Sequence, residues 1–287
     1  MTTVDLIQHT IDELTPSLGP AEATSVARLL LEDLFGFRRG QRPRKLEPDE
    51  QLLAWTALNR LRAGEPVQYV TGVADFYGLQ FHVTPAVLIP RPETEELVEW
   101  VLQEMGARTQ VQGLDVGTGS GCIPLALANR RPAWQLTGVD VSEAALDVAR
   151  ANADRLGLAV SFATLDVLDD AANMTFASTT AAPAYDLIVA NPPYIPPAER
   201  DLMGASTLAH EPALALFVPD DDPLLFYQRI GRLARLLMRP GGQLFFETNE
   251  HNNGAVVDLL AGLGFREGEV RKDLQGKDRM VRAVWPG

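Results

Sequence analysis

The spacing of apolar residues divides the chain into a helical first part and an alternating second part. Up to about residue 75, apolar residues recur at intervals of three and four, at 4–14, 23–35 and 51–61. This is the period of a helix that is buried along one face. Pro16 and the pair Gly19-Pro20 interrupt the first pattern. We therefore predict a small bundle of helices for the first part.

From Val111 onward, short apolar runs alternate with amphipathic stretches. The runs lie at 111–116, 135–139, 158–163, 185–190, 242–247 and 279–284. Helical patterns fill most of the intervals, for example at 142–156, 224–238 and 253–262. This alternation predicts an α/β fold with a doubly wound sheet that helices cover on both faces. Residues 169–184 show no period, and we expect a surface loop there.

A segment of different character joins the two parts. Residues 76–83 (FYGLQFHV) alternate well enough for a strand or hairpin, with Gly78 at the turn, and 93–105 predicts a helix with Pro92 in its first turn. We therefore divide the chain into a helical domain at 1–75, a strand or hairpin linker at 76–90 and an α/β domain at 91–287.

Composition and charge narrow the classes of protein. The chain has 287 residues and a formal net charge of −13, which opposes general binding to a phosphate backbone. Neither a signal peptide nor an apolar stretch long enough for a membrane span is visible, and we expect a cytoplasmic protein. The four histidines are scattered without metal-ligand spacing, so we expect no metal. The single cysteine, Cys122, excludes an internal disulfide and is expected to be packed at a helix start.

A glycine-rich segment follows the first predicted strand of the sheet. It consists of Gly117, Thr118, Gly119, Ser120 and Gly121. Glycines let the chain turn sharply and let a ligand approach the backbone closely. The G-x-G-x-G spacing differs from the G-x-G-x-x-G of dinucleotide enzymes, in which a helix N-terminus binds a pyrophosphate. Taken alone, the segment could also be a tight turn without a ligand.

Acidic residues mark the ends of the next two predicted strands. Asp140 ends the second strand, where an acid can accept hydrogen bonds from both ribose hydroxyls, and Asp166 closes the third, where it could bind an adenine amino group. The alternatives are a capping role for Asp140, ahead of the helix that starts at Ser142, and a solvated position for Asp166. Three such features at successive strand ends predict a nucleoside site at the carboxyl edge of the sheet.

The fourth predicted strand runs into Asn191-Pro192-Pro193-Tyr194. An amide or adenine NH2 group is a weak nucleophile because its lone pair is delocalised. The Asn191 side-chain oxygen and the Pro192 backbone oxygen can accept its two hydrogens, which orients the nitrogen and stabilises the positive charge that develops on it. Tyr194 offers a flat ring for stacking. A rigid turn after a strand is the alternative.

In this order, the motifs resemble those of class I S-adenosylmethionine-dependent methyltransferases that act on planar amino groups. More narrowly, the chain resembles the HemK-type peptide chain release factor glutamine methyltransferases. The matching segments are 65–72 (EPVQYVTG), 76–81 (FYGLQF), 88–95 (LIPRPETE), 211–216 (EPALAL) and 273–279 (DLQGKDR). The chain departs from the family at 218–223, where a glycine-rich turn is usual, and at 247–249, where Glu-Thr-Asn replaces Glu-Ile-Gly. A family glutamine is also replaced, by Asn252 or Asn253.

The resemblance implies a Rossmann-like fold with a mostly parallel, seven-stranded sheet. It implies methyl transfer from S-adenosylmethionine, with S-adenosylhomocysteine as product, to the N5 amide nitrogen of a glutamine in class I release factors, and so a role in translation termination. The expected cofactor contacts are Gly117, Thr118, Gly119, Ser120, Gly121, Asp140, Asp166, Val167 and Asn191. The expected substrate contacts are Asn191, Pro192, Pro193 and Tyr194, with Asn191, Pro192 and Tyr194 as the catalytic residues. Arg91 and Glu93 are expected near the pocket or at a helix start.

Three other functions compete with this interpretation. An adenine-N6 methyltransferase of DNA or RNA can use the same Asn-Pro-Pro-Tyr segment, but the acidic balance and the small helical domain favour a protein substrate over direct nucleic-acid binding. The intact Asn191–Tyr194 segment argues against a nucleoside-binding protein without catalysis. The spacing of the glycine loop argues against a nicotinamide dehydrogenase. We expect the helical domain, which carries no catalytic motif, to dock the substrate.

Overall fold

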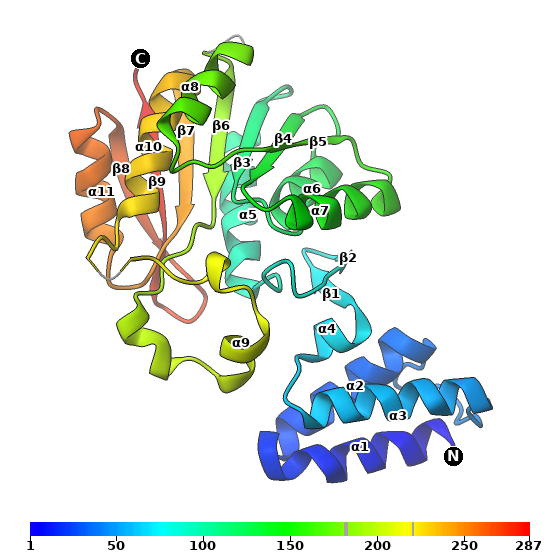
Figure 1. Cartoon of the computed structure of the whole chain (residues 1–287). Coiled ribbons are helices and arrows are strands. Elements are labelled where there is room, and N and C mark those ends of the chain that lie inside the picture. Colours follow the sequence, from blue (N-terminus) through cyan, green and yellow to red (C-terminus); the bar gives the residue numbers. More distant parts are fainter. Residues whose placement is uncertain (181–182, 220) are drawn as a thin grey trace. The chain divides into compact units, whose positions relative to one another are not determined.

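The computed structural model describes residues 1–180, 183–219 and 221–287 (Figure 1). Residues 181 and 182 of the expected loop, and Asp220 within the divergent segment 218–223, lie outside the described residues. The chain forms two compact units. The helical unit comprises residues 1–73, 83–85 and 203–211, and the sheet unit comprises 74–82, 86–202 and 212–287.

The helical unit is built around three long helices. Its helices are α1 (Thr3–Leu18), α2 (Pro20–Phe35), α3 (Pro48–Arg62), α4 (Val67–Thr71) and α9 (Ala205–His210). Thr2 starts α1 with a capping box, since its hydroxyl accepts from the Asp5 N–H and the Asp5 carboxylate accepts from the Thr2 N–H. The expected break at Pro16 is wrong, because α1 continues to Leu18 and ends at Gly19. A proline so near the end of a helix removes one hydrogen bond without stopping the last turn.

A hairpin precedes the main sheet. Strands β1 (Val73–Phe76) and β2 (Leu79–His82) pair with each other, and the turn residues Tyr77 and Gly78 have φ angles of 50° and 77°. Two positive φ angles are typical of the tight turns that join antiparallel strands. The predicted hairpin and its turn at Gly78 are therefore confirmed, but the first strand begins at Val73, inside the range predicted to be helical.

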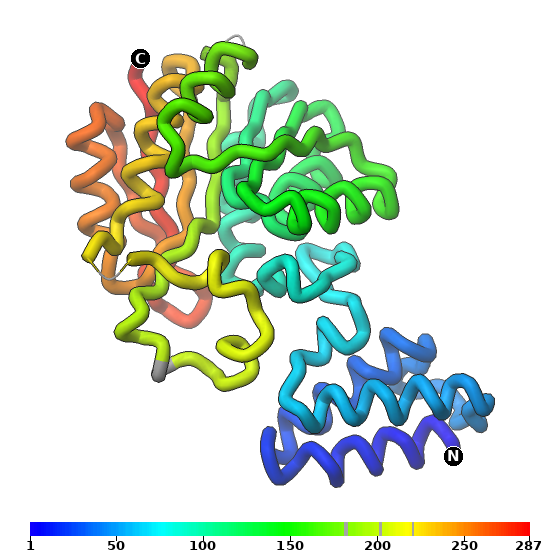
Figure 2. Tube along the Cα trace, viewed as in Figure 1, coloured from blue at the N-terminus to red at the C-terminus, as the bar shows by residue number. Residues whose placement is uncertain are grey.

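The main sheet has seven strands in the order β5-β4-β3-β6-β7-β9-β8. They are β3 (Gln112–Val116), β4 (Gln135–Asp140), β5 (Val160–Thr164), β6 (Tyr185–Ala190), β7 (Met238–Glu247), β8 (Arg266–Lys272) and β9 (Asp278–Trp285). The first five in this order are parallel, and β9 runs antiparallel to both of its neighbours. Because of this strand order, residues 112–164 and 238–285 form opposite halves of the sheet (Figure 2). The predicted doubly wound, mostly parallel sheet is confirmed.

Helices cover both faces of this sheet. They are α5 (Pro92–Met105), α6 (Cys122–Arg130), α7 (Glu143–Leu156), α8 (Asp170–Thr179), α10 (Leu225–Leu237) and α11 (Asn253–Gly262). Successive residues of a strand point to opposite faces. Phe245 of β7 accordingly packs edge-on against Trp100 of α5, while Phe246 packs against Tyr227 of α10. Figure 1 shows α8 beside α10, and residues of both helices pack in the same apolar core.

Two elements differ from the expectation. The segment 169–184 contains helix α8, which starts where the Asp169 carboxylate accepts hydrogen bonds from the Ala171 and Ala172 N–H groups. Strand β8 has no counterpart among the predicted runs, because its sequence is mostly charged and exposed. It forms the outer edge of the sheet, where charged side chains are common.

Within the described residues, the structure contains no helix that is both long and apolar enough to cross a membrane.

Candidate active site

Parallel strands of the sheet end side by side, with predicted site residues just beyond them. The register pairs Val116 of β3 with Ala190 of β6 and with Val139 of β4, and it pairs Ala190 with Phe246 of β7. The residues that follow these positions are Gly117, Asp140, Asn191 and Glu247. The structure thus brings the glycine loop, Asp140 and the Asn191–Tyr194 segment together at the carboxyl edge, where open α/β sheets bind ligands.

The glycine loop borders open space. A Cβ atom added to Gly117 or Gly119 would meet nothing within 4 Å, and the φ angles of these residues are +75° and +53°. Only glycine adopts such angles readily. The N–H groups of Gly117 and Thr118 both donate to the Val139 carbonyl, which ties the loop to β4. The backbone of the loop is therefore fixed and can approach a ligand closely.

Asp140 is joined to that loop. One carboxylate oxygen accepts from the Gly119 N–H at 2.9 Å, and the other accepts from the Ser142 N–H at 2.9 Å. Each carboxylate oxygen can accept two hydrogen bonds, so both retain capacity for the hydroxyls of a ligand. Ser142 itself caps α7, since its hydroxyl accepts from the Ala145 N–H. Helix capping therefore does not require Asp140.

Asp166 and Val167 lie one strand further out. Strand β5 ends at Thr164, so Asp166 follows the strand by two residues and does not close it. The Asp166 side chain is exposed, and its carboxylate accepts from the Leu168 N–H, while the Val167 carbonyl accepts from the Asn173 side chain. Within the described part of the chain, the hydrogen bonds of Asp166 and Val167 go to residues other than the glycine loop, whereas Asp140 is bonded to Gly119 of that loop.

Asp115 is a buried acid that the sequence analysis passed over. It is 2% exposed, and neither of its carboxylate oxygens has a hydrogen-bond partner among the described residues. The hydroxyls of Thr118 and Ser120 are also buried without partners in this part of the chain. Burial raises the pKa of Asp115 to about 7, and the nearby Asp140 carboxylate adds to the rise. A carboxyl group and two hydroxyls that the described residues leave without partners at the glycine loop fit a nucleoside that carries positively charged groups, as S-adenosylmethionine does.

The Asn191–Tyr194 segment leads to a second buried acid. The Asn191 side-chain NH2 group donates to the Thr94 hydroxyl at 3.1 Å, and that hydroxyl donates to the Glu247 carboxylate at 2.6 Å. The Tyr194 hydroxyl donates to the other Glu247 oxygen at 3.2 Å. Burial, and then the neighbouring Glu247, raise the pKa of Tyr194, so the phenol stays protonated. Thr94 lies within LIPRPETE and Glu247 ends an apolar run, but nothing in the sequence pairs them.

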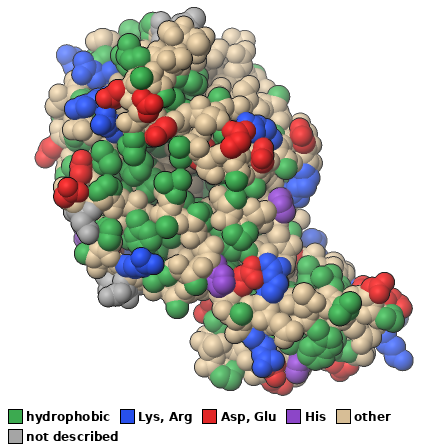
Figure 3. Space-filling view, viewed as in Figure 1, with side chains coloured by type: hydrophobic (Ala, Val, Ile, Leu, Met, Phe, Trp, Pro, Cys, Tyr) green, Lys and Arg blue, Asp and Glu red, His purple; other side chains and the backbone are tan. Residues whose placement is uncertain are grey.

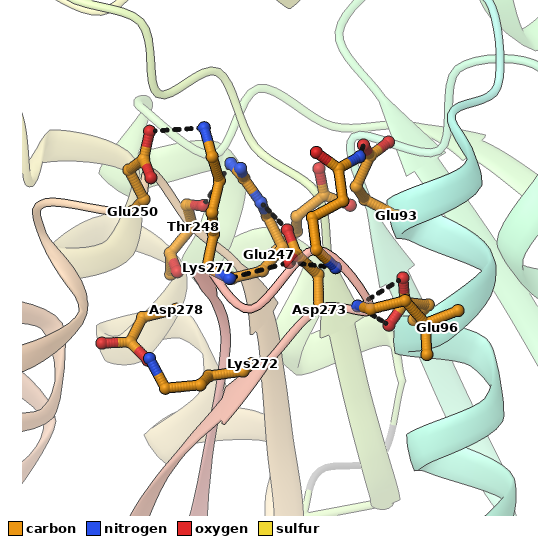
Figure 4. A network of polar contacts seen from close by, with 12 residues as sticks. Glu93, Glu96, Glu247, Thr248, Glu250, Lys272, Asp273, Lys277 and Asp278 are labelled. Atoms are coloured by element: carbon orange, nitrogen blue, oxygen red, sulfur yellow. Dashed lines mark hydrogen bonds and ion pairs between the residues drawn. The ribbon is translucent and has the colours of Figure 1, made fainter.

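A well-anchored turn borders the same edge (Figure 4). The Asp273 carboxylate accepts from the Gln275 and Lys277 N–H groups and forms an ion pair with Arg279 at 3.3 Å. Glu93 and Glu96 reach the turn from α5, where Glu93 accepts from the Gln275 side chain and Glu96 from the Leu274 N–H. Arg91 immediately precedes α5, so the structure places the Arg91–Glu93 region at a helix start.

Cys122 begins α6 and is not poised as a nucleophile. Desolvation raises the pKa of its thiol to about 12, with Asp115 adding to the rise. Among the described residues, the structure groups no three His, Cys, Asp or Glu side chains in a way that could hold a metal ion.

Relatives of known family match most of the chain. Residues 95–216 match the family model described as "Methyltransferase small domain", and residues 5–72 match "PrmC N-terminal domain". A release factor glutamine methyltransferase of Bacteroides thetaiotaomicron is 44% identical over 78% of this chain and 77% of its own length. The chain belongs to the release factor glutamine methyltransferase family. Another member of this family, from Deinococcus radiodurans, is 34% identical over 97% of both chains.

Solved structures support the fold of this methyltransferase independently. The catalytic domain of hMettl16, solved with a MAT2A 3′UTR hairpin, covers 87% of this chain and 86% of its own with a TM-score of 0.56 and 17% identity. A human methyltransferase 10 domain containing protein covers 82% of this chain and 96% of its own, with a TM-score of 0.51 and 16% identity. At such identities the likeness establishes the methyltransferase fold and says nothing about the substrate.

Proposed function

We propose that this enzyme transfers a methyl group from S-adenosylmethionine to the N5 amide nitrogen of a glutamine in class I peptide chain release factors. The reaction would take place in the cytoplasm and modulate translation termination. The observation that carries the proposal is the register between β3 and β6, which sets the glycine loop beside Asn191. A cofactor held by the loop and an amide held by Asn191 would then lie within reach of one another.

The chain's own residues would act on the methyl acceptor. The Asn191 side-chain oxygen and the Pro192 carbonyl accept the two hydrogens of the glutamine NH2 group, which turns the nitrogen toward the methyl donor. These oxygens also stabilise the positive charge that develops on the nitrogen during transfer. The Tyr194 ring covers one face of the planar amide, with Pro193 keeping the backbone rigid. No strong base is needed beforehand, because the nitrogen loses its proton more readily once it is methylated.

The cofactor would be held by the residues around the glycine loop. When it is bound, S-adenosylmethionine supplies an electrophilic methyl group on a sulfonium. The loop from Gly117 to Gly121 would let the cofactor approach its backbone closely, and Asp140 would accept hydrogen bonds from the ribose hydroxyls. Asp166 and Val167 border the adenine, and the Asn191 backbone contributes on the side of β6. The buried Asp115 carboxylate complements the cofactor's positive charge.

An adenine-N6 activity is the second candidate, because adenine carries a similar amino group. The charge of the protein disfavours a nucleic-acid substrate, since duplex binding depends on Lys and Arg contacts to phosphates. The net charge is −13, and acidic and basic side chains are interspersed on the face seen in Figure 3. A protein acceptor therefore fits the surface better than a nucleic acid.

The decisive experiment supplies labelled S-adenosylmethionine with a purified class I release factor or with adenine-containing DNA or RNA. We expect the label on one glutamine of the release factor, located by mass spectrometry, and none on nucleic acid. Asn191→Ala should lower the turnover by about 100-fold or more, because it removes an acceptor that is already in place for the transition state. Cofactor affinity should change much less. Label on adenine, or near-normal turnover by Asn191→Ala, would contradict the proposal.

A further inference from the structure

The Glu247 carboxyl group occupies a costly position. Glu247 is 1% exposed and lies at the end of β7. The preceding residue, Phe246, pairs with Ala190 of β6, so Glu247 and Asn191 follow paired positions of neighbouring strands. A buried carboxyl group destabilises a protein unless hydrogen bonds compensate it. Burial raises the pKa of Glu247, whereas hydrogen bonds from Thr94 and Tyr194 lower it. An acid retained in this position must therefore serve the residues that it touches.

The direction of the hydrogen bonds decides how Asn191 is oriented. A threonine hydroxyl has one proton, and Thr94 gives it to Glu247 across the shorter of its two contacts, at 2.6 Å. The hydrogen bonds from Thr94 and Tyr194 favour the ionised form of Glu247. With Glu247 ionised, the Thr94 oxygen can then only accept toward Asn191. Its partner at 3.1 Å must be the NH2 group of the Asn191 side chain. The carbonyl oxygen of Asn191 consequently points away from Thr94 and is available to a methyl acceptor.

The second oxygen of Glu247 holds the other end of the segment. It accepts from the Tyr194 hydroxyl at 3.2 Å. One carboxyl group thus restrains both ends of the Asn191–Tyr194 segment. It holds Asn191 through Thr94, and it holds Tyr194 directly. Strand β7 is itself fixed at this point, because the Tyr227 hydroxyl donates to the Glu247 backbone carbonyl at 3.3 Å.

We propose that Glu247 and Thr94 are positioning residues that set the Asn191 amide with its oxygen toward the methyl acceptor and hold Tyr194 beside it. Neither residue needs to touch the cofactor or the acceptor. The pair removes the alternative orientation, in which the Asn191 NH2 group would face the substrate NH2 group with no acceptor between them. The inference rests on the proposed role of Asn191 as an acceptor.

Thr94→Val tests the proposal because valine matches threonine in shape and lacks the hydroxyl. We expect kcat to fall between about 10- and 100-fold, with cofactor affinity within about twofold of the wild type, since only the orientation of the acceptor groups is lost. Thr94→Ser keeps the hydroxyl and should retain most of the activity. If Thr94→Val does not fold, Thr94→Ala removes the same hydroxyl without adding a methyl group.

Thr248→Val is the matched control. Thr248 is 0% exposed and its hydroxyl donates over the same distance, 2.6 Å, but to Asn253 and away from the Asn191–Tyr194 segment. It should leave kcat within about twofold of the wild type if the effect belongs to the contact with Asn191. Equal losses in Thr94→Val and Thr248→Val, or a normal kcat in Thr94→Val, would overturn the proposal.

An independent measurement separates this inference from the proposed function. In protein labelled with ¹⁵N-asparagine, the Asn191 side-chain NH2 resonances, assigned by their absence from Asn191→Ala, should show one proton that exchanges slowly with solvent. This protection should disappear in Thr94→Val and persist in Thr94→Ser, whether or not a release factor is methylated. Unchanged protection in Thr94→Val would refute the orientation by Thr94. Failure of the wild type to methylate a release factor would refute only the proposed substrate.

Discussion

At the scale of single residues, two acids of the candidate active site are removed from water. Asp115 at the glycine loop and Glu247 beside Asn191 are 2% and 1% exposed, and burial raises the pKa of each. A folded enzyme that buries such groups is less stable than one with uncharged residues at the same positions. We therefore expect the two acids to serve the proposed chemistry rather than stability.

The raised pKa of Asp115 predicts how stability depends on pH. Its pKa is about 7 in the folded protein against 3.8 when unperturbed, so the folded state binds the proton more tightly than the unfolded state does. The stabilisation of the folded state by this tighter proton binding is fully present below pH 3.8 and is lost as the pH rises through about 7. Asp115→Asn removes it. From pH 4 to pH 8 the free energy of unfolding of the variant should therefore rise relative to that of the wild type, by as much as about 4 kcal/mol.

Urea unfolding of both proteins without cofactor, at pH values from 4 to 8, measures this difference. A constant offset between the two curves is expected, because asparagine also lacks partners there; the prediction concerns the widening gap. Parallel curves across the range would show that Asp115 titrates normally in the folded enzyme.

The sequence reveals some of these residues and conceals others for a physical reason. Gly117, Asp140 and Asn191 stand directly after apolar runs, so the rule that parallel strands end at one edge is enough to group them. The contact between Thr94 and Glu247 joins residues that are 153 positions apart. It depends on how α5 packs against the end of β7, and no local pattern encodes that packing.

At the scale of elements, the periodic segments were predictable and the weakly periodic ones were not. Helix α8 has only Asn173 fully buried, and it is stabilised by its Asp169 cap and by contacts such as that of Phe176 with the core. Strand β8 exists because β9 offers it a partner. Both depend on tertiary context, which overrides local propensity in segments without a strong apolar pattern.

Strand β4 also makes room for the glycine loop, and this gives an element-scale prediction. A Cβ atom on Gly138 would lie 2.6 Å from the Thr118 hydroxyl and 2.8 Å from the Phe162 ring. Gly138→Ala must therefore push the loop or the ring aside. We expect cofactor affinity to fall by about 10-fold and the free energy of unfolding by about 1–3 kcal/mol.

Calorimetric titration with S-adenosylmethionine and urea unfolding measure the two effects. Gly262→Ala in α11 is the matched control, since a Cβ atom there meets nothing within 4 Å, and alanine favours a helix. The control should bind cofactor normally and be no less stable than the wild type. Normal cofactor binding by Gly138→Ala would show that the loop tolerates the displacement.

At the scale of the whole molecule, we expect catalysis and recognition to belong to different units. The glycine loop, Asp140, Asn191 and Glu247 all belong to the sheet unit. Helix α3 of the helical unit carries three exposed apolar side chains, Leu52, Leu53 and Trp55, which are 68%, 45% and 42% exposed. The Trp55 ring is also held edge-on by His9 of α1. Exposed apolar groups that cluster on one helix commonly mark a surface that binds another protein.

This surface predicts how the enzyme selects one glutamine among many. In the proposed mechanism, Asn191–Tyr194 contact only the amide end of the glutamine side chain, so binding far from the reacting nitrogen must choose the acceptor. If α3 docks the release factor, Leu52→Glu should raise KM for the whole factor by about 10-fold or more, since burying a leucine contributes about 1.5–3 kcal/mol. A short glutamine peptide, which lacks the body of the factor, should keep its KM, and so should the cofactor. The control is Leu236→Glu on α10, whose leucine is 42% exposed and belongs to the sheet unit; it should behave as the wild type with both acceptors. Steady-state kinetics with the two acceptors separate the outcomes: equal changes with factor and peptide would assign α3 a purely stabilising role, and no change with either would place docking elsewhere on the protein.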